Sequence, residues 1–526
     1  MDAVAETVQQ LIEGMRQRSG FLCSEDSLEE LSTAFMNSSL SAEAMEPTEY
    51  LKWLRCNVLE REVIIESPMM MGHMTTKLPS YMPDLGKLVT AMNLNLVKTE
   101  TAKVTSLLER EAIAVLHKEI FHQDDAFYAR HVQCRSSSLG VMTSGGTAAN
   151  IQALWMARQR LCPDAEARGL TLTGARRAVV LTSALAHYSV EKAMCLLGLG
   201  SENLIKVQTL SDFSVDVKAM KRVLQRLENV QVMAIVGLAG ATETGHVDDL
   251  EALADLAASL GAHFHVDAAW GFPLLLDKDH GRGLMKGAER ADTVAVDGHK
   301  LLYTPMGCGT LLMRNPLDPS RVCKSARYII REDSFDQGRF TLEGSRPAMA
   351  IYLHMNLRCL GRQGLLSRIA AGCALAQRLA EMLRRDESSF ELITDPPQSN
   401  IVLYRYIPRS FRHLGSVLEE HGKALDHFQV ALQSAQAAAG RSFVSRTAVP
   451  VRRYGGNFVV CLRAVFGNPS INEEHLEQML QDQERHASEL EKFLFSTAID
   501  IAPSPGGTTR VPDAGEAGEA GEESSD

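Results

Sequence analysis

In the first hundred residues, apolar positions recur every three or four residues, which is the spacing of one face of an α-helix. This pattern predicts helices over Leu51–Glu66 and Leu85–Val97. The segment between them, Met69–Ser80, holds four methionines together with polar residues that include His73 and Thr75. Methionine-rich segments usually fill gaps in a core, but the polar side chains would also suit the wall of a pocket. Both interpretations of this loop remain open from the sequence.

From about residue 104 the pattern changes to short apolar runs that alternate with helical segments. Helices are predicted at Val104–Ile120, Ala148–Leu161 and Asp248–Leu260, and strands at Ala178–Thr182, Val232–Gly237, Ala262–Val266 and Thr293–Val296. This alternation is typical of parallel βαβ units with helices on both faces of the sheet. One further run, Gly309–Arg314, follows Lys300 too closely for a crossover helix, so we expect it to pair antiparallel.

A different pattern follows Pro347. One long helical stretch is predicted up to about Arg385, and then two strands, Asn400–Tyr406 and Phe458–Phe466, bracket a helix near Gly415–Ala439. We therefore predict an α/β protein with a mostly parallel sheet in a large domain and a smaller α+β C-terminal domain. The predicted divisions are a helical segment at 1–103, the large domain at 104–350, the small domain at 351–500 and a disordered acidic tail at 501–526.

Composition and charge exclude several classes of protein. Of 526 residues, 45% are hydrophobic and 23% charged, which is ordinary for a globular protein. The net charge is −11, and residues 501–526 carry −5 of it, so no basic surface for nucleic acid is indicated. No apolar run is long enough for a membrane helix, and no signal peptide is visible. The ten cysteines form no closely spaced pair, which favours reduced thiols and a cytoplasmic location.

Four features carry candidate chemistry. Lys300 and Asp267 each follow a predicted strand, where parallel sheets place their ligands. The glycine turn Ser144–Thr147 opens a predicted helix, and a helix N-terminus with a nearby hydroxyl binds phosphate well. The fourth feature is His187, which follows the predicted strand Ala178–Thr182. Each feature alone has an ordinary structural explanation: a surface lysine, a satisfied histidine or a tight loop.

A metal site is the rival interpretation of the segment around Asp267. His263, His265 and Asp267 alternate, so they would share one face of a strand and could ligate a metal. No other cluster in the sequence completes such a site, and we predict no metal. The four features together suit one cofactor, pyridoxal phosphate, which needs a lysine, a carboxylate, a phosphate cup and an aromatic group over its ring.

The chain resembles the group II pyridoxal-phosphate-dependent amino-acid decarboxylases from about residue 50 to 480. The motifs that carry this resemblance are Thr143-Ser-Gly-Gly-Thr-Ala-Ala-Asn150, Ala186-His-Tyr-Ser-Val-Glu-Lys-Ala193, His265-Val-Asp-Ala-Ala269 and Asp297-Gly-His-Lys300. Weaker support comes from Ala239–Thr242, Glu343–Pro347 and Leu462–Arg463. Within the family, residues 72–76 and 95–100 look most similar to bacterial aspartate 1-decarboxylases of the glutamate-decarboxylase type.

The resemblance implies a type I aminotransferase-like fold, a homodimer with active sites at the subunit interface, and a role for each matching residue. Lys300 would form the Schiff base, Asp267 would face the pyridine nitrogen and His187 would stack on the ring. The other cofactor-binding residues implied are Gly145, Gly146, Thr147, Thr242, Ala269, His299 and, from the neighbouring subunit, Ser345. The loop from Tyr328 to Arg346 is short and has no tyrosine after Tyr328, so the resemblance supplies no proton donor from that loop.

The function implied is decarboxylation of a small acidic L-amino acid, with L-aspartate ahead of L-glutamate. A second carboxylate needs a cation or several donors, because burying it unpaired is costly. The candidates are His73, Thr75 and Arg463, with Thr76, Lys77 and Arg346 as further possibilities. The alternatives are another group II amino-acid decarboxylase, an aminotransferase or carbon–carbon lyase of the same fold, and a protein of this fold that has lost catalysis and acts as a binding partner.

Overall fold

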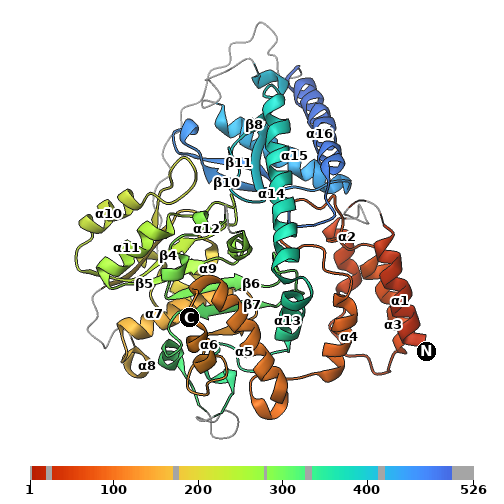
Figure 1. Cartoon of the computed structure of the whole chain (residues 1–526). Helices are drawn as coiled ribbons and strands as arrows, with labels where there is room; N and C mark the ends of the chain where they lie inside the picture. The colour runs from red at the N-terminus through yellow and green to blue at the C-terminus, as the bar shows by residue number, and fades with distance from the viewer. Residues whose placement is uncertain are drawn as a thin grey trace, which may run out of the picture.

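A computed structural model describes residues 3–18, 20, 27–169, 177–277, 281–325, 334–412 and 421–499, with side chains up to Lys492. Figure 1 shows three parts: N-terminal helices on one side, a large sheet with its helices, and a smaller sheet above them. The predicted tail 501–526 and Tyr328 lie outside the described residues. The predicted domain boundaries remain predictions.

The large sheet has seven strands in the order β1-β7-β6-β5-β4-β2-β3. Strands β3, β2, β4, β5 and β6 run parallel, whereas β7 pairs antiparallel with both β6 and β1. The antiparallel strand predicted at Gly309–Arg314 is therefore confirmed. The bounds are β1 Gly140–Thr143, β2 Arg177–Ser183, β3 Leu204–Val207, β4 Val230–Leu238, β5 His263–Asp267, β6 Thr293–Asp297 and β7 Gly309–Met313.

Helices cover both faces of this sheet, as the alternation of side chains along β2 shows. Val179 and Leu181 join a core cluster with residues of α5 (Thr99–Phe121) and α11 (Leu250–Leu260). Val180 points to the opposite face and joins a cluster with α7 (Gly146–Leu161) and α9 (Tyr188–Leu196). Successive residues of a strand face opposite sides, so one apolar run serves two helical layers and the predicted α/β fold class is confirmed. Further helices of this part are α6 Asp125–His131, α8 Ala165–Arg168, α10 Val217–Arg226 and α12 Gly281–Leu284.

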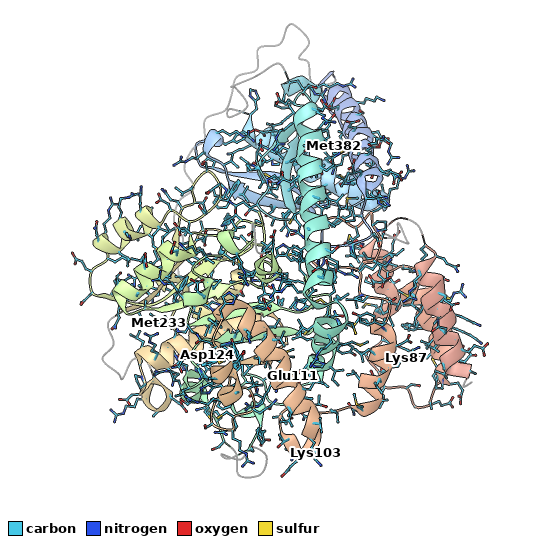
Figure 2. All side chains as sticks on the ribbon, in the orientation of Figure 1. Lys87, Lys103, Glu111, Asp124, Met233 and Met382 are labelled. Carbon is cyan, nitrogen blue, oxygen red and sulfur yellow. The ribbon has the colours of Figure 1, made fainter. Side chains whose placement is uncertain are left out.

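The smaller sheet is antiparallel, with strand order β10-β11-β9-β8. Its strands are β8 Phe390–Leu392, β9 Ile401–Tyr406, β10 Ser445–Pro450 and β11 Phe458–Val465, and its helices are α14 Gly361–Arg385, α15 Gly422–Ala439 and α16 Glu473–Ile499. It has its own apolar cluster, against which Met382 of α14 packs, whereas Met233 of β4 belongs to the large-sheet side (Figure 2). This is the expected α+β C-terminal lobe.

Several predicted helix ends are wrong. The N-terminal helices are α1 Ala3–Arg16, α2 Leu28–Ser32, α3 Pro47–Leu54 and α4 Met82–Met92. The helix predicted to Glu66 stops after a π-turn at Arg55–Leu59, because the chain then turns so that the Met71 backbone can pair with Phe443 and Val465. Helix α4 ends at Asn93, which adopts a left-handed conformation, rather than at Val97.

The single helix predicted after Pro347 is two helices. Helix α13 (Met349–Cys359) and α14 are separated at Leu360, where Gly361 has a φ of +59°, and α14 continues upward along the smaller sheet (Figure 1). Four strands were not predicted: β1, β3, β8 and β10. Three of them have only three or four residues, and β10 is a half-exposed edge strand that ends in Pro450, so none carries a clear apolar run.

Candidate functional site

A cavity of about 640 Å³ lies at the carboxyl ends of the parallel strands. Three parts of the chain form its wall: the turns after β1, β2, β4, β5 and β6, the loop Gly72–Thr75, and strands β10 and β11 of the smaller sheet. Twelve residues singled out in the sequence line it: His73, Thr75, Gly145, Gly146, Thr147, His187, Thr242, Asp267, Ala269, His299, Lys300 and Arg463. Ser345 does not; it is exposed and accepts a hydrogen bond from Asn95 (3.0 Å).

Lys300 sits just beyond the end of β6, where Asp297 is the last strand residue. The Lys300 Nζ lies 3.1 Å from the Asp297 Oδ2, and the His299 Nε2 lies 3.6 Å from the same oxygen. The His299 ring is oriented by its Nδ1, which donates to the carbonyl of Cys308 (3.0 Å). Asp297 is 3% exposed, and its Oδ1 has no hydrogen-bond partner among the described residues. A buried carboxylate thus holds the amine of Lys300 at the cavity wall.

Asp267 ends β5 and presents its carboxylate to the cavity. Its Oδ2 accepts a hydrogen bond from the Asn150 Nδ2 (2.8 Å), and its Oδ1 accepts one from the backbone N–H of Ala269 (3.2 Å). Both oxygens are therefore held by N–H donors. This arrangement gives the cavity a carboxylate in a fixed position.

His187 is the N-cap of α9 and borders the same cavity. Its Nδ1 lies 2.8 Å from the Ser189 Oγ and 3.3 Å from the backbone N of Ser189. Burial lowers the pKa of His187; the charges of Asp267 and Asp297 oppose this and those of Lys300 and Lys192 add to it. The ring is consequently neutral at physiological pH.

Helix α7 begins at Gly146 with Gly145 as its N-cap, so its first backbone N–H groups have no intrahelical partners. Thr147 adds a hydroxyl at the same edge of the cavity. A Cβ at Gly146 would lie 3.0 Å from the Asp297 Oδ2 and 3.2 Å from the Ala269 Cβ, so any side chain here would have to displace one of these neighbours. A helix start of this kind binds phosphate.

The residues present fit pyridoxal phosphate. The start of α7 suits its phosphate, the amine of Lys300 suits its aldehyde, and the carboxylate of Asp267 suits its ring nitrogen. His187 supplies an aromatic ring at the same cavity. The donor set is thus complete except for Ser345, which this chain does not bring to its own cavity.

Arg463 is a buried cation in the cavity wall. It comes from β11, is 6% exposed, and its Nε donates to the carbonyl of Glu243 (3.2 Å). Its Nη1 bonds the carbonyl of Gly72 and the Ser445 Oγ, whereas its Nη2 has no hydrogen-bond partner among the described residues. Burial lowers the pKa of Arg463 to about 10, so it is still charged near neutral pH.

His73 and Thr75 lie beside this guanidinium on the N-terminal loop. The His73 Nδ1 accepts the backbone N–H of Thr75 (3.0 Å). Partial burial, with Arg463 nearby, lowers the pKa of His73. The methionine-rich loop therefore both fills the core and lines a pocket. Met71 is fully buried in a core cluster, while residues 72–75 line the cavity.

Three further candidates for a substrate carboxylate lie elsewhere. Arg346 is buried in an ion pair with Glu109 (3.0 Å), and Lys77 donates to the Ser470 Oγ (3.2 Å). The Thr76 side chain is buried and does not line the cavity. Spacing along the chain could not show that the polar loop residues point in different directions.

The sequence interpretation missed residues that the fold brings to the cavity. Asn150 and Asp297 stand inside motifs noted in the sequence, but no role was assigned to them. Ser445 belongs to β10, a strand that was not predicted, and Glu243 follows Thr242 directly. Burial raises the pKa of the Glu243 carboxyl. The sequence signal that could have identified Asn150 is a polar residue at a helical position that the apolar pattern predicts to be buried.

His263 and His265 take part in hydrogen bonds rather than in a metal site. The Nε2 of His263 lies 2.8 Å from the Thr293 Oγ1, and the Nδ1 of His265 lies 2.9 Å from the same atom. Within the described part of the chain, no three His, Cys, Asp or Glu side chains are grouped to hold a metal ion. Nor does any described helix have both the length and the apolar character needed to cross a membrane.

Comparison with known proteins agrees with this geometry. The family model of the pyridoxal-dependent decarboxylase conserved domain matches residues 54–407. The chain is 36% identical to aspartate 1-decarboxylase of Aliivibrio fischeri over 90% of this chain and 89% of that protein. It is 34% identical to the human acidic amino acid decarboxylase GADL1 over 52% and 54% of the two chains. A crystal structure of mouse CSAD in apo form superposes with a TM-score of 0.81 at 25% identity, covering 92% of this chain and 98% of that one. The chain belongs to the pyridoxal-dependent decarboxylase family and is a group II amino-acid decarboxylase, a carboxy-lyase with pyridoxal phosphate as its cofactor.

Proposed function

We propose that this enzyme removes the α-carboxylate of a short acidic L-amino acid, with L-aspartate, which gives β-alanine and CO2, ahead of L-glutamate, which gives γ-aminobutyrate. The observation that carries the proposal is Arg463. Its guanidinium is buried in the cavity wall, and its Nη2 lacks a hydrogen-bond partner among the described residues. No salt bridge to Arg463 forms among the described residues, although the charge of the buried Glu243 carboxyl acts on it. Burial raises the pKa of Glu243, and a buried guanidinium with an open Nη2 and no direct ion pair suits an anionic substrate.

The neighbours of Arg463 support a small, polar substrate. His73 and Thr75 line that side of the cavity, and the loop segment Gly72–Thr75 contributes no phenylalanine, tyrosine or tryptophan. The relative named aspartate 1-decarboxylase also aligns over nine-tenths of the chain. The preference for aspartate over glutamate rests on this likeness, since one methylene is worth only ~1–3 kcal/mol to a pocket.

The chain's own residues divide the work. When bound, pyridoxal phosphate supplies the electron sink for the bond that breaks. Lys300 holds the cofactor, and Gly145, Gly146 and Thr147 bind its phosphate at the start of α7. Asp267 holds a proton on the ring nitrogen, because a nearby anion favours the charged form of a base. His187 would cover the ring and, through the N–H of its neutral imidazole, would donate a hydrogen bond on the cavity side.

Thr242, Ala269 and His299 complete the proposed cofactor contacts. Ala269 would pack beneath the ring of a bound cofactor, His299 would lie beside its phosphate and Thr242 would lie near the ring substituents. All three line the cavity. Their proposed roles follow from these positions and from the family motifs that they match.

We further propose a homodimer in the cytoplasm, with Ser345 reaching the phosphate of the partner subunit. Large apolar side chains stay exposed along the N-terminal segment, among them Leu28 (80%), Met36 (77%) and Leu40 (99%). Such a surface suits burial against a second copy. All described cysteines are free thiols, which suits a reducing compartment.

Replacing Arg463 with glutamine tests the proposed substrate class. We expect kcat/KM for L-aspartate to fall about 100-fold, because losing one partner of a buried charged pair costs about 2–5 kcal/mol. Steady-state kinetics of CO2 release would measure this. The matched control is Arg453→Gln, since Arg453 pairs with Glu391 outside the cavity and we expect wild-type kinetics. An Arg463→Gln enzyme with unchanged kcat/KM for aspartate would contradict the proposal.

A further inference from the structure

The buried side-chain amide of Asn150 connects two groups that line the cavity: the Asp267 carboxylate directly, and the His187 ring through Ser189. Asn150 lies on α7, is 1% exposed, and engages both hydrogens of its amide and its carbonyl oxygen. Its Nδ2 donates to the Asp267 Oδ2 (2.8 Å) and to the Ser189 Oγ (2.9 Å), while its Oδ1 lies 2.9 Å from the His265 Nε2. The orientation of the amide follows from Asp267, because a carboxylate only accepts hydrogen bonds.

The amide orientation fixes the protons on one side of Asn150. Its Oδ1 can only accept, so the Nε2 of His265 carries a hydrogen. Burial lowers the pKa of His265 to about 4, so near neutral pH its Nδ1 is an acceptor. The Thr293 hydroxyl, 2.9 Å away, donates to that nitrogen and accepts from the His263 Nε2 (2.8 Å). The Nδ1 of His265 also lies 3.2 Å from the Thr293 carbonyl oxygen, which cannot donate, so in this protonation state only the Thr293 hydroxyl bonds that nitrogen.

On the other side of Asn150, hydrogen bonds through Ser189 determine which nitrogen of His187 carries the proton. The Ser189 Oγ accepts from Asn150, which leaves its own hydrogen free to donate to the His187 Nδ1 (2.8 Å). The backbone N–H of Ser189 approaches the same nitrogen (3.3 Å). The Nδ1 of His187 is thus an acceptor, and a neutral ring must carry its proton on Nε2.

We propose that Asn150 is a positioning residue that, through one amide, holds the Asp267 carboxylate and, by way of Ser189, fixes the proton of His187 on Nε2. The inference rests on the proposed function, in which Asp267 and His187 act on the bound cofactor. It explains why Asp267 presents a hydrogen-bond acceptor to the cavity and His187 presents a donor. Asn150 itself does not need to touch the substrate.

The isosteric change Asn150→Asp tests the link to Asp267. The introduced carboxyl can donate to Asp267 only while it is protonated. Burial and the neighbouring carboxylate raise its pKa, and above that pKa two carboxylates repel each other. The titratable groups that face this position are Asp267 and His265 from β5, His187 before α9, Asp297 at the end of β6 and Lys300 just after it.

We expect kcat of Asn150→Asp to fall with rising pH along a new descending limb that the wild-type enzyme lacks. Asn150→Ala, which cannot donate at any pH, is expected to be slow throughout, without this limb. Gln159→Glu is the control, because Gln159 is a buried amide of the same helix bonded to Glu166 away from the cavity. A wild-type pH profile for Asn150→Asp, or wild-type kcat for Asn150→Ala, would overturn the proposal.

The link to His187 has a readout that does not depend on activity. Histidine ring nitrogens can be observed by 15N NMR of the holoenzyme, with the His187 signals assigned by their loss in His187→Gln. We expect a protonated Nε2 and an unprotonated Nδ1 in the wild type. Ser189→Ala removes the donor hydroxyl, and we expect a mixed tautomer population and a kcat lower by about tenfold, the effect of one lost hydrogen bond. A protonated Nδ1 in the wild type would contradict the proposal.

The proposed roles of His187 and Asp267 and the positioning role of Asn150 can be tested separately. If His187→Gln and Asp267→Asn both kept wild-type rates, the proposed function of these residues would be wrong and the positioning role with it. If both lost activity while Asn150→Asp and Ser189→Ala behaved as wild type, the positioning role alone would be wrong. Thermal unfolding and cofactor absorbance of each variant show that the protein compared is folded and loaded.

Discussion

Replacing Lys300 with alanine is expected to lower turnover by at least about 10³-fold, a typical loss when one group that transfers protons is removed. The variant also loses the visible absorption band that a lysine-bound pyridoxal cofactor gives. The reason is position: the Nζ of Lys300 stands at the carboxyl end of β6, inside the cavity, 3.1 Å from Asp297. Absorption spectra and CO2 release under identical conditions would measure both effects.

Alanine also leaves the buried Asp297 without its ion pair, so a second variant separates chemistry from stability. Lys300→Arg keeps a cation beside Asp297, but a guanidinium stays protonated and cannot replace the amine. We expect it to fold well and to be as inactive as the alanine variant. Lys286→Ala serves as the control, since Lys286 makes only an exposed pair with Glu251. An active Lys300→Arg enzyme would show that another residue holds the cofactor.

Replacing Asp267 with asparagine is expected to reduce kcat by about 10²–10³-fold, the range for loss of one preorganised electrostatic group. A neutral amide cannot hold a proton on the ring nitrogen as a carboxylate can. In the wild type both oxygens of Asp267 accept from N–H donors, on Asn150 and Ala269. In the variant the new NH2 group must face one of these donors, and two donors cannot bond each other. We therefore expect retained cofactor binding with a modest loss of thermal stability.

Kinetics and cofactor content of the purified Asp267→Asn variant would measure these two effects. Its matched control is Asp255→Asn, which neutralises an exposed partner of Arg290 on α11. The role assigned to Asp267 requires a large fall in kcat without loss of cofactor. Wild-type kcat in Asp267→Asn would contradict that role.

The fold was largely predictable because its long apolar runs belong to the centre of the large sheet. Strands β2, β4, β5 and β6 have helices on both sides, so nearly all their residues are buried. Strands such as β3 and β10 lie at sheet edges, where half or more of the positions are not fully buried. Their pairing depends on tertiary contacts, which local periodicity does not contain.

The candidate site was predictable where a residue stands at a strand end, as Lys300, Asp267 and His187 do. Topology brings such residues to one edge. The contribution of the second sheet was harder to see. Arg463 enters the cavity from β11, about 160 residues after Lys300 in the sequence, and only the docking of the two sheets brings them together. Asn150 was missed because a buried amide on a helix looks like any other polar position until its partners are known.

The most direct test of the account is a competition assay with the wild-type enzyme and equal concentrations of L-aspartate and L-glutamate, followed by a wider amino-acid panel. We expect the enzyme to release CO2 without a keto-acid co-substrate, with β-alanine as the main product and γ-aminobutyrate second. Dominant formation of tyramine, tryptamine or hypotaurine would contradict the central claim that the cavity around Lys300 and Arg463 selects a short acidic amino acid.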